Sequence, residues 1–281
     1  MELFEGRRKE SVGSSRIRGT WIANNWPEAE IFKVAVKYDA IIFQKSYFLT
    51  FMKAYKGIKI LDMCDPDWLE GKLVKQAIEL CDAVTTSSEK LAEFIRSITD
   101  KPVVCIPDRM DLKEHKRKKI HEGNAQRVVW FGYSNNHKVV DRILLTLKKL
   151  GLGLTIVSDM PYYPNAAISG IDDTWIRENV KNIKYDHESI NEEIVDGGDI
   201  VINPKLSDLA RFKYKSNNKT LTAWALGMPV ATNEEELIKF IDPVERQKEA
   251  DKRYDEVVKD WEIGASVQQY CDILKSIGDN K

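Results

Sequence analysis

The chain has 281 residues, of which 43% are hydrophobic and 31% are charged, as is usual for globular proteins. This length favours two domains of about 100–170 residues each. The 43 basic residues are balanced by 44 acidic ones, and the resulting net charge of -1 excludes a strong overall attraction to polyphosphates or membranes. A bound anion would have to be held by a local group of cations.

The cysteines have no metal-binding or redox spacing, which is typical of a reduced compartment. They are Cys64, Cys81, Cys105 and Cys271. No apolar run reaches the about 20 residues of a membrane-spanning helix, and the N-terminus lacks the apolar stretch of a signal peptide. We expect a cytoplasmic protein that uses no metal.

Short β-branched runs alternate with helical patterns in the first half of the chain, which is typical of βα units on a parallel sheet. Strands are expected at Asp39–Phe43, Ile58–Met63, Ala83–Thr86 and Val103–Ile106. Helices are expected at Leu69–Leu80 and Ser88–Ser97, with Ser87 or Ser88 as the N-cap of the second. The stretch before them, residues 13–19, is expected to be a loop.

The polar stretch Lys113–Asn124 (KEHKRKKIHEGN) then interrupts the pattern. We interpret it as an exposed linker between domains, in which His115 and His121 are solvated. The alternative is a basic patch that binds the acceptor of a transfer reaction.

A second βα series follows the linker. Its strands are expected at Arg127–Phe131, Leu154–Val157, Asn182–Tyr185, Ile200–Ile202 and Pro229–Thr232. Its helices are expected at Lys138–Leu150, Ile190–Val195, Asn217–Leu226 and Glu234–Phe240, followed by helix to the C-terminus. The pattern predicts two Rossmann-like, doubly wound α/β domains that face a central cleft. We place them at 1–118 and 119–255, with residues 256–281 as a helix that crosses back to the N-terminal domain.

The most informative segment is a group of cations at the start of a predicted helix: Arg211, Lys213, Lys215 and Lys219. A helix N-terminus offers free N–H groups and a partial positive charge, and Ser216 and Asn217 add further donors. Lys215 and Lys219 would share one face of the helix, where like charges repel unless an anion lies between them. This predicts a diphosphate site, with a solvated basic helix start as the alternative.

Lys215–Ala231 (KSNNKTLTAWALGMPVA) resembles the nucleotide-sugar-binding segment of GT-B glycosyltransferases of family 4, where K-S-N-x-K leads to an alanine-rich helix and G-x-P-V. Val128–Gly132, followed by Tyr133, resembles the first strand and glycine turn of the donor domain. Asp199–Pro204 resembles the strand that precedes the cations. Ile60–Asp67, Cys81–Ser88 and Cys105–Leu112 resemble elements of the acceptor-side domain, in the expected order.

The resemblance implies a GT-B fold and transfer with retention of anomeric configuration. It implies no cofactor beyond a nucleotide diphosphate sugar as co-substrate, for which we expect a UDP-sugar. The implied donor-binding residues are Gly132, Tyr133, Arg211, Lys215, Ser216, Asn217 and Lys219. Many family members bind the ribose through the second Glu of an E-x7-E pair, but Tyr214 and Thr222 stand at these two positions here. Ribose recognition must therefore differ.

Two segments are candidates for the acceptor side. Asp62, Asp65 and Asp67 lie at the end of a predicted strand, and their mutual repulsion could raise the pKa of one of them. Asp65 could then orient or deprotonate an acceptor hydroxyl, unless the segment is only a turn with a helix cap.

The second acceptor-side candidate is the glycine-flanked stretch that holds Ser15, Arg16 and Arg18. On an extended chain the two arginines would project to the same side and could grip a phosphate. A plain surface loop is the alternative.

We therefore predict a glycosyltransferase, hexosyl or pentosyl, with Asp65, Lys215 and Lys219 as catalytic residues. The stretches GSSRIRG and DPDW faintly resemble phage-type enzymes that glycosylate hydroxymethylated bases in DNA, so DNA is one hypothesis for the acceptor. A glycan or a lipid is the other. Two further functions stay open: a non-catalytic protein that binds nucleotide sugars or polyanions, and a sugar-nucleotide epimerase. The sequence does not predict the oligomeric state.

Overall fold

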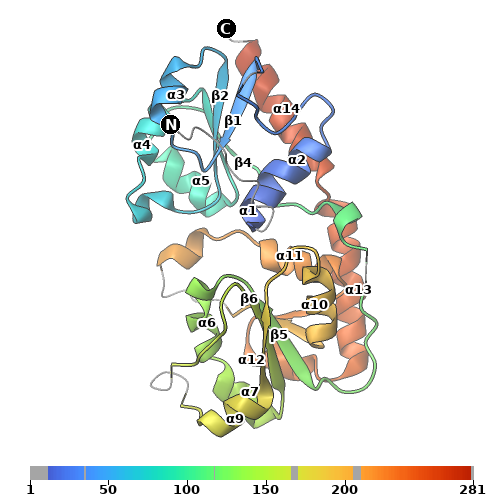
Figure 1. The fold of residues 1–281 in the computed structure, drawn as a ribbon. Coiled ribbons are helices and arrows are strands. Elements are labelled where there is room, and N and C mark those ends of the chain that lie inside the picture. Colours follow the sequence, from blue (N-terminus) through green and yellow to red (C-terminus); the bar gives the residue numbers. More distant parts are fainter. Residues whose placement is uncertain (1–11, 35, 117, 166–169, 205–209, 280–281) are drawn as a thin grey trace. The chain divides into compact units, whose positions relative to one another are not determined.

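A computed structural model describes residues 12–34, 36–116, 118–165, 170–204 and 210–279 (Figure 1). The chain forms two compact units. Unit 1 comprises Met1–Asp111, Ser207–Asn217 and Glu262–Lys281, and unit 2 comprises Leu112–Leu206 and Asn218–Trp261. The observed boundaries lie several residues from those predicted at 118 and 255. No pattern in the sequence indicates that a piece ending at Asn217 belongs to unit 1.

The sheet of unit 1 is parallel, with the strand order β1-β2-β3-β4. Its strands are β1 (Ala40–Gln44), β2 (Ile58–Met63), β3 (Ala83–Thr86) and β4 (Val103–Cys105). The core on one face joins β1, β2 and β3 to helices α3 (Leu49–Ala54), α4 (Val74–Leu80) and α5 (Glu89–Arg96). Ser88 caps α5 as predicted, because its hydroxyl accepts a hydrogen bond from the Leu91 amide at 3.3 Å.

The expectation of a loop at residues 13–19 was wrong. The chain is helical from α1 (Gly13–Ser15) through a π-helical turn (Arg16–Thr20) to α2 (Trp21–Asn24). Ile17, Trp21 and Ile22 are buried and form an apolar face that holds the helix in place. This face is hard to recognise in the sequence because Gly and Ser residues lie around it. Arg16 and Arg18 therefore do not point to the same side, as they would on an extended chain.

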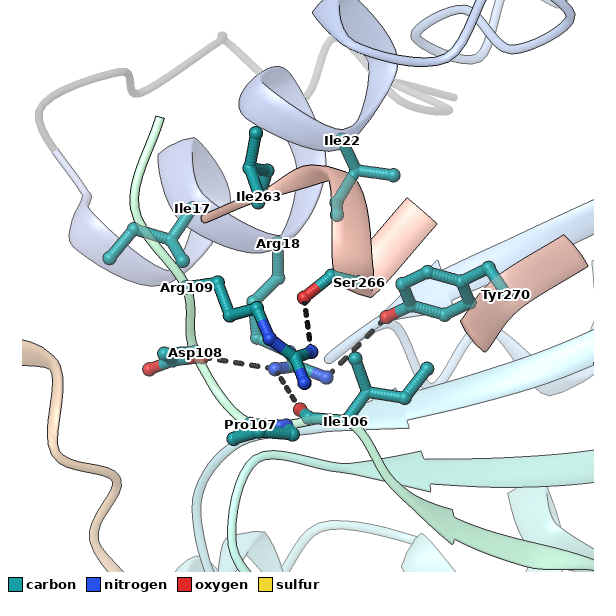
Figure 2. A pocket seen from close by; sticks show the side chains of 10 residues that line it. All are labelled: Ile17, Arg18, Ile22, Ile106, Pro107, Asp108, Arg109, Ile263, Ser266 and Tyr270. Carbon is teal, nitrogen blue, oxygen red and sulfur yellow. Dashed lines mark hydrogen bonds and ion pairs between the residues drawn. The ribbon is translucent and has the colours of Figure 1, made fainter. Parts of the chain in front are cut away.

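Arg18 is buried in an ion network rather than exposed to an acceptor. Its guanidinium donates to both carboxylate oxygens of Asp62, at 2.8 and 2.6 Å, and to Asp108 at 3.0 Å. It also donates to the Ile106 carbonyl at 2.7 Å (Figure 2). Tyr270 of α14 (Gly264–Gly278) donates its hydroxyl to Asp62 at 3.0 Å. Arg18 and Asp62 are thus structural, and their assignment to the acceptor side is corrected.

The sheet of unit 2 is also parallel, with the order β7-β6-β5-β8-β9. Its strands are β5 (Arg127–Phe131), β6 (Gly153–Ser158), β7 (Val180–Lys184), β8 (Ile200–Ile202) and β9 (Val230–Ala231). The chain runs outward from β5 to β7 and then returns to β8 on the other side of β5. The strand order therefore reverses between β5 and β8, as in doubly wound sheets.

Helices cover both faces of this second sheet (Figure 1). Val128 and Trp130 of β5 pack in a core with α6 (Lys138–Asp141), α7 (Leu144–Leu150) and α12 (Glu234–Lys239). Val129 and Phe131 face the opposite core, with α10 (Ile190–Gly197) and α11 (Asn218–Ala225). Unit 2 also contains α9 (Asp173–Asn179) and α13 (Pro243–Asp260). No helix in the described part of the chain is both long enough and apolar enough to span a membrane.

His121 is buried, so the expectation that it is solvated was wrong. Its Nε2 lies 2.9 Å from the carbonyl oxygen of Gly227, and its Nδ1 accepts from Arg246 at 3.1 Å. This pattern requires a neutral ring that carries its proton on Nε2. Burial lowers the pKa of His121, the Gly227 carbonyl raises it, and Arg246 lowers it further; the net shift is downward.

Replacing Asp62 with Ala should destabilise the protein by about 3–5 kcal/mol, because the buried Arg18 guanidinium would lose its bidentate partner. Urea denaturation measures this free energy of unfolding. Glu93→Gln is the control, since it breaks an exposed pair with Lys90 and should change stability little. A loss below about 1 kcal/mol for Asp62→Ala would contradict the structural role.

Acidification should destabilise the fold through His121. Its pKa in the folded state lies below the unfolded value of about 6.5, so the unfolded state takes up the proton first and stability falls as the pH drops below about 6.5. In His121→Gln the fall in melting temperature between pH 7.5 and 5.5 should be smaller than in the wild type. His187→Gln serves as the control for removal of a loop histidine. An unchanged pH dependence in His121→Gln would refute this account.

Candidate functional site

At the switch point of unit 2, where the strand order reverses between β5 and β8, a lysine side chain packs against the backbone of a glycine. Gly132 directly follows β5 and has a φ of 149°, a conformation that residues with a side chain rarely adopt. A Cβ atom there would collide with the Lys219 ammonium and lie 2.8 Å from Lys219 Cε. Lys219 is the second residue of α11, and its Nζ lies 4.2 Å from the centroid of the Trp130 ring. The glycine thus makes room for the lysine at the carboxyl end of β5.

Side chains from β8 and α11 meet at the same edge of the sheet. Asn203, which follows β8, donates its side-chain amide to the Thr220 hydroxyl at 3.2 Å. The first turn of α11 therefore starts where β5 and β8 end, and the first amides of a helix have no partner within the helix. A cation beside the first turn of a helix at a switch point forms a site suited to an anion.

Polar and aromatic groups surround this anion site. His137 packs edge-on against Trp130, with ring centroids 5.4 Å apart, and its Nε2 lies 3.0 Å from the Ser158 hydroxyl. Burial lowers the pKa of His137, and Lys219 adds to that shift against the opposing effect of nearby carboxylates. Tyr133, the next residue after Gly132, is 43% exposed. At neutral pH the site thus has a lysine cation beside a neutral histidine.

The other predicted cations lie in unit 1 and not on a helix with Lys219. α11 begins at Asn218, so Lys215 precedes it, and the expectation of two ammonium groups on one helix face was wrong. Ala210–Tyr214 form a short 3-10 helix instead. Ser216 and Asn217 are half-buried residues between this turn and α11. Lys215 and Lys219 remain neighbours in sequence, so their Cα atoms are at most about 14 Å apart.

Tyr214 anchors the segment Arg211–Lys215, which we call the basic segment, to the rest of unit 1. Its ring lies 5.3 Å from Trp68, edge to face, and Trp68 stacks on Phe94 with ring centroids 4.0 Å apart. Ser88, the N-cap of α5, also donates its hydroxyl to the Tyr214 carbonyl at 2.9 Å. Aromatic packing and a hydrogen bond thus fix the backbone at Tyr214, between Lys213 and Lys215.

A series of ion pairs with alternating charges also attaches the basic segment to unit 1. We call this series the ion chain. From one end to the other it consists of Arg211, Glu70, Lys72, Asp67, Lys45, Asp65 and Lys215. The nitrogen–oxygen distances along it, in this order, are 3.0, 3.5, 3.3, 3.6, 2.5 and 2.9 Å. Both ends are cations of the basic segment, and the middle is supplied by the loops after β1 and β2.

Asp65 is an ionised carboxylate held between two lysines. The Lys45 ammonium lies 2.5 Å from Asp65 Oδ2, and the Lys215 ammonium lies 2.9 Å from Asp65 Oδ1. Burial alone would raise the pKa of Asp65, but Lys215 and Lys45 outweigh it and the pKa is lowered. The expected rise in pKa through repulsion among the carboxylates does not occur at Asp65, because each neighbouring acid has its own cation. Asp67 is buried and accepts from the Tyr47 hydroxyl at 2.5 Å.

Lys45 reaches Asp65 from a strained backbone. It follows β1 with φ of 48°, in the left-handed region that costs a residue with a side chain about 1–2 kcal/mol. Its amide donates to the Asp62 carbonyl at 2.9 Å, which fixes this turn against the end of β2. Lys45 was not among the residues predicted from the sequence, although its position two residues after a predicted strand was a usable signal.

The remaining predicted residues have local roles. Ser15 lies in α1, and the Arg16 guanidinium lies 5.7 Å from the Trp21 ring centroid. In the linker, Lys119 donates to the carbonyls of Val195 and Gly198 at 2.8 and 2.7 Å. Within the described ranges, no three His, Cys, Asp or Glu side chains are grouped closely enough to hold a metal ion.

Comparison with solved structures identifies the fold. The crystal structure of TarM superposes with a TM-score of 0.62 at 10% identity, over 83% of this chain and 54% of TarM. AviGT4, a glycosyltransferase involved in avilamycin A biosynthesis, gives 0.52 at 12% identity, over 85% of this chain and 73% of its own. A putative UDP-N-acetylglucosamine 2-epimerase from Listeria monocytogenes gives only 0.47 at 13% identity, over 85% and 73%.

Neither a protein-family model nor a curated protein sequence matches the chain. The chain spans about half the length of TarM. At these identities the likeness concerns the fold, and it confirms the prediction of two Rossmann-like units in the GT-B class.

Gly132→Ala should destabilise the protein by about 1–3 kcal/mol, because the new methyl group requires an unfavourable φ and displaces the Lys219 side chain from Trp130. Thermal or urea unfolding measures the loss. Gly19→Ala is the matched control: no atom lies within 4 Å of the added methyl group and the segment is helical, so stability should be unchanged or increased. Equal effects of the two substitutions would contradict the packing described for Gly132.

Proposed function

We propose that the protein is a glycosyltransferase that moves a sugar from a nucleotide diphosphate donor, preferably a UDP-sugar, to a hydroxyl acceptor. The observation that carries this proposal is the placement of the Lys219 ammonium beside Gly132, at the start of α11 and at the switch point of unit 2. Diphosphates require charge and N–H donors from several directions, and this edge of the sheet supplies both.

In the proposed reaction the leaving diphosphate is stabilised by Lys219, by the amides at the start of α11 and by Lys215. Ser216 and Asn217, which lie between the two lysines, add amides to the same group. Fixed positive charge is most effective at the atoms where negative charge develops as the bond to the sugar breaks. The resemblance to family 4 adds retention of configuration, in which the leaving phosphate itself assists the acceptor's deprotonation.

Asp65 acts in this proposal as an orienting group for the acceptor hydroxyl. Its lowered pKa keeps it ionised at neutral pH, where a carboxylate accepts a hydrogen bond from a hydroxyl but takes its proton only weakly. Asp67 and Arg211 hold the ion chain in place around it.

The acceptor is a glycan, a lipid or a hydroxymethylated DNA base. Two cations that could have contributed to DNA binding have partners within the protein. Arg18 pairs with Asp62, and Lys119 donates hydrogen bonds to backbone carbonyls. Activity on DNA should fall steeply with rising salt, whereas activity on a neutral glycan should not.

Two assays separate the proposal from its alternatives. A thermal-shift screen with UDP, GDP, ADP, CMP and TDP identifies the nucleotide, because binding to the folded state raises the melting temperature. Release of that nucleotide from its sugars with candidate acceptors present then reports turnover. A binding protein would release none, and an epimerase would convert the donor alone.

Lys219→Gln should weaken binding of the stabilising nucleoside diphosphate at least about 10-fold, which is about 1.4 kcal/mol, because a charge-assisted hydrogen bond to phosphate is lost. Isothermal titration calorimetry measures the dissociation constant. Lys181→Gln, an exposed lysine of β7 in the same unit, is the control and should bind normally. Normal binding by Lys219→Gln would remove the observation on which the proposal depends.

A further inference from the structure

We propose that Asp159 binds the ribose of the nucleotide donor by accepting a hydrogen bond from one of the two ribose hydroxyls. This inference rests on the proposed function and deepens it, because it assigns a residue to the ribose although Thr222 stands where many family 4 enzymes have a ribose-binding Glu. All the residues on which it depends lie in unit 2.

Asp159 lies at the same edge of the sheet as the Lys219 ammonium. It directly follows β6, which is the neighbour of β5 in the sheet. The Ser134 amide, two residues after Gly132, donates to Asp159 Oδ1 at 2.7 Å. The Cα atoms of Gly132 and Ser134 are at most about 7 Å apart. The carboxylate therefore lies close to the glycine turn against which the Lys219 side chain packs.

Three hydrogen bonds fix the orientation of the Asp159 carboxylate. The Ser134 amide and the Ser158 hydroxyl donate to Oδ1, at 2.7 and 3.1 Å, and the Ser134 hydroxyl donates to Oδ2 at 3.3 Å. Because the Ser158 hydroxyl donates to Asp159, His137 must carry a proton on Nε2, which lies 3.0 Å from the same hydroxyl oxygen. A carboxylate has about four acceptor positions, so one position on Oδ2 is left for a ligand hydroxyl.

Asp159 is an exposed, ionised carboxylate. Burial raises its pKa, but the hydrogen bonds from Ser134 and Ser158 outweigh this effect, so the pKa is lowered. No Lys or Arg among the described residues forms an ion pair with it, in contrast to Asp65, whose two oxygens each contact a lysine. The charge of Asp159 is therefore available to a ligand.

Asp141 of α6 is a second carboxylate near this edge, but it is used within the fold. It is buried, and it accepts hydrogen bonds from the Tyr162 hydroxyl at 2.6 Å and from the Asn165 amide at 3.0 Å. Of the two carboxylates, Asp159 is the one that a ligand can reach.

A carboxylate beside an anion site selects among the anions that bind there. Its like charge weakens the binding of inorganic phosphates. A nucleotide offsets this repulsion, because its ribose is joined to the diphosphate and brings hydroxyl donors to the same edge. A hydrogen bond from a hydroxyl to an ionised carboxylate is about twice as strong as one between neutral groups. Asp159 thus favours nucleoside diphosphates over inorganic ones.

The position of Asp159 also agrees with a general feature of nucleotide-binding parallel sheets. In dinucleotide-binding folds the glycine turn after the first strand receives the phosphates, and an acidic residue further along the chain binds a ribose hydroxyl. In unit 2, Gly132 follows the first strand and Asp159 follows the second.

Calorimetric titration of the full chain with four ligands tests the assignment. The ligands are the nucleoside diphosphate found in the thermal-shift screen, forms of it that lack the 2′- or the 3′-hydroxyl, and inorganic pyrophosphate. The wild type should bind the parent nucleotide about 5- to 10-fold more tightly than at least one of the two deoxy forms, because the deoxy form cannot donate to the Asp159 carboxylate.

Asp159→Asn removes the charge but keeps an oxygen that can accept from the Ser134 amide. This variant should lose the preference for the parent nucleotide over the deoxy form, and its affinity for the nucleotide relative to pyrophosphate should fall at least about 5-fold. Pyrophosphate itself should bind as tightly as to the wild type or more tightly, because a like charge is removed. A merely structural role of Asp159 would weaken the binding of both ligands alike.

Glu178→Gln is the matched control for removal of an exposed carboxylate from unit 2. Glu178 lies two residues before β7, at the amino end of the parallel strands, whereas Asp159 follows the carboxyl end of β6. This variant should keep the affinities and the preference of the wild type.

The outcomes separate this assignment from the proposed function. Equal binding of the parent nucleotide and both deoxy forms by the wild type overturns the role of Asp159, and so does an unchanged preference in Asp159→Asn. Either result leaves the glycosyltransferase proposal intact as long as Lys219→Gln weakens the binding of nucleotide and pyrophosphate. Normal binding by Lys219→Gln overturns the proposed function itself. If Asp159→Asn does not fold, the comparison of ligands on the wild type still decides.

Discussion

The buried pair between Arg18 and Asp62 is the constraint on which unit 1 depends. Asp62 lies in a central strand with no exposed surface, where an ionised carboxylate is tolerated only with full compensation. Arg18, Thr85 and Tyr270 provide that compensation, and with it the helical N-terminal segment and the C-terminal helix are tied to β2. The loop that carries Asp65 leaves the sheet from the end of this strand, so the pair also fixes the position from which this part of the ion chain extends.

Parallel sheets explain why so much of the fold could be predicted from the sequence. Their strands are buried on both faces and read as short apolar runs, such as Val128–Phe131 and Ile200–Ile202, which stand out from their polar surroundings. The strands expected in both halves are present, most with small differences at their ends. The glycine turn after β5 was equally accessible, because a glycine directly after a buried strand marks a close approach of the backbone to another group.

The errors have a common physical origin, since each concerns a segment whose partner is distant in the sequence. Gly13–Gly19 has the composition of a loop, and its helix exists because Ile17 and Trp21 find an apolar surface that local propensity does not report. The expectation that Lys215 shares a helix face with Lys219 fails because the preceding residue, Tyr214, packs against Trp68 and Phe94, which lie more than 100 residues earlier in the sequence. Whether Asp62 or Asp65 faces a ligand depends on which cation reaches it, and no spacing rule gives that.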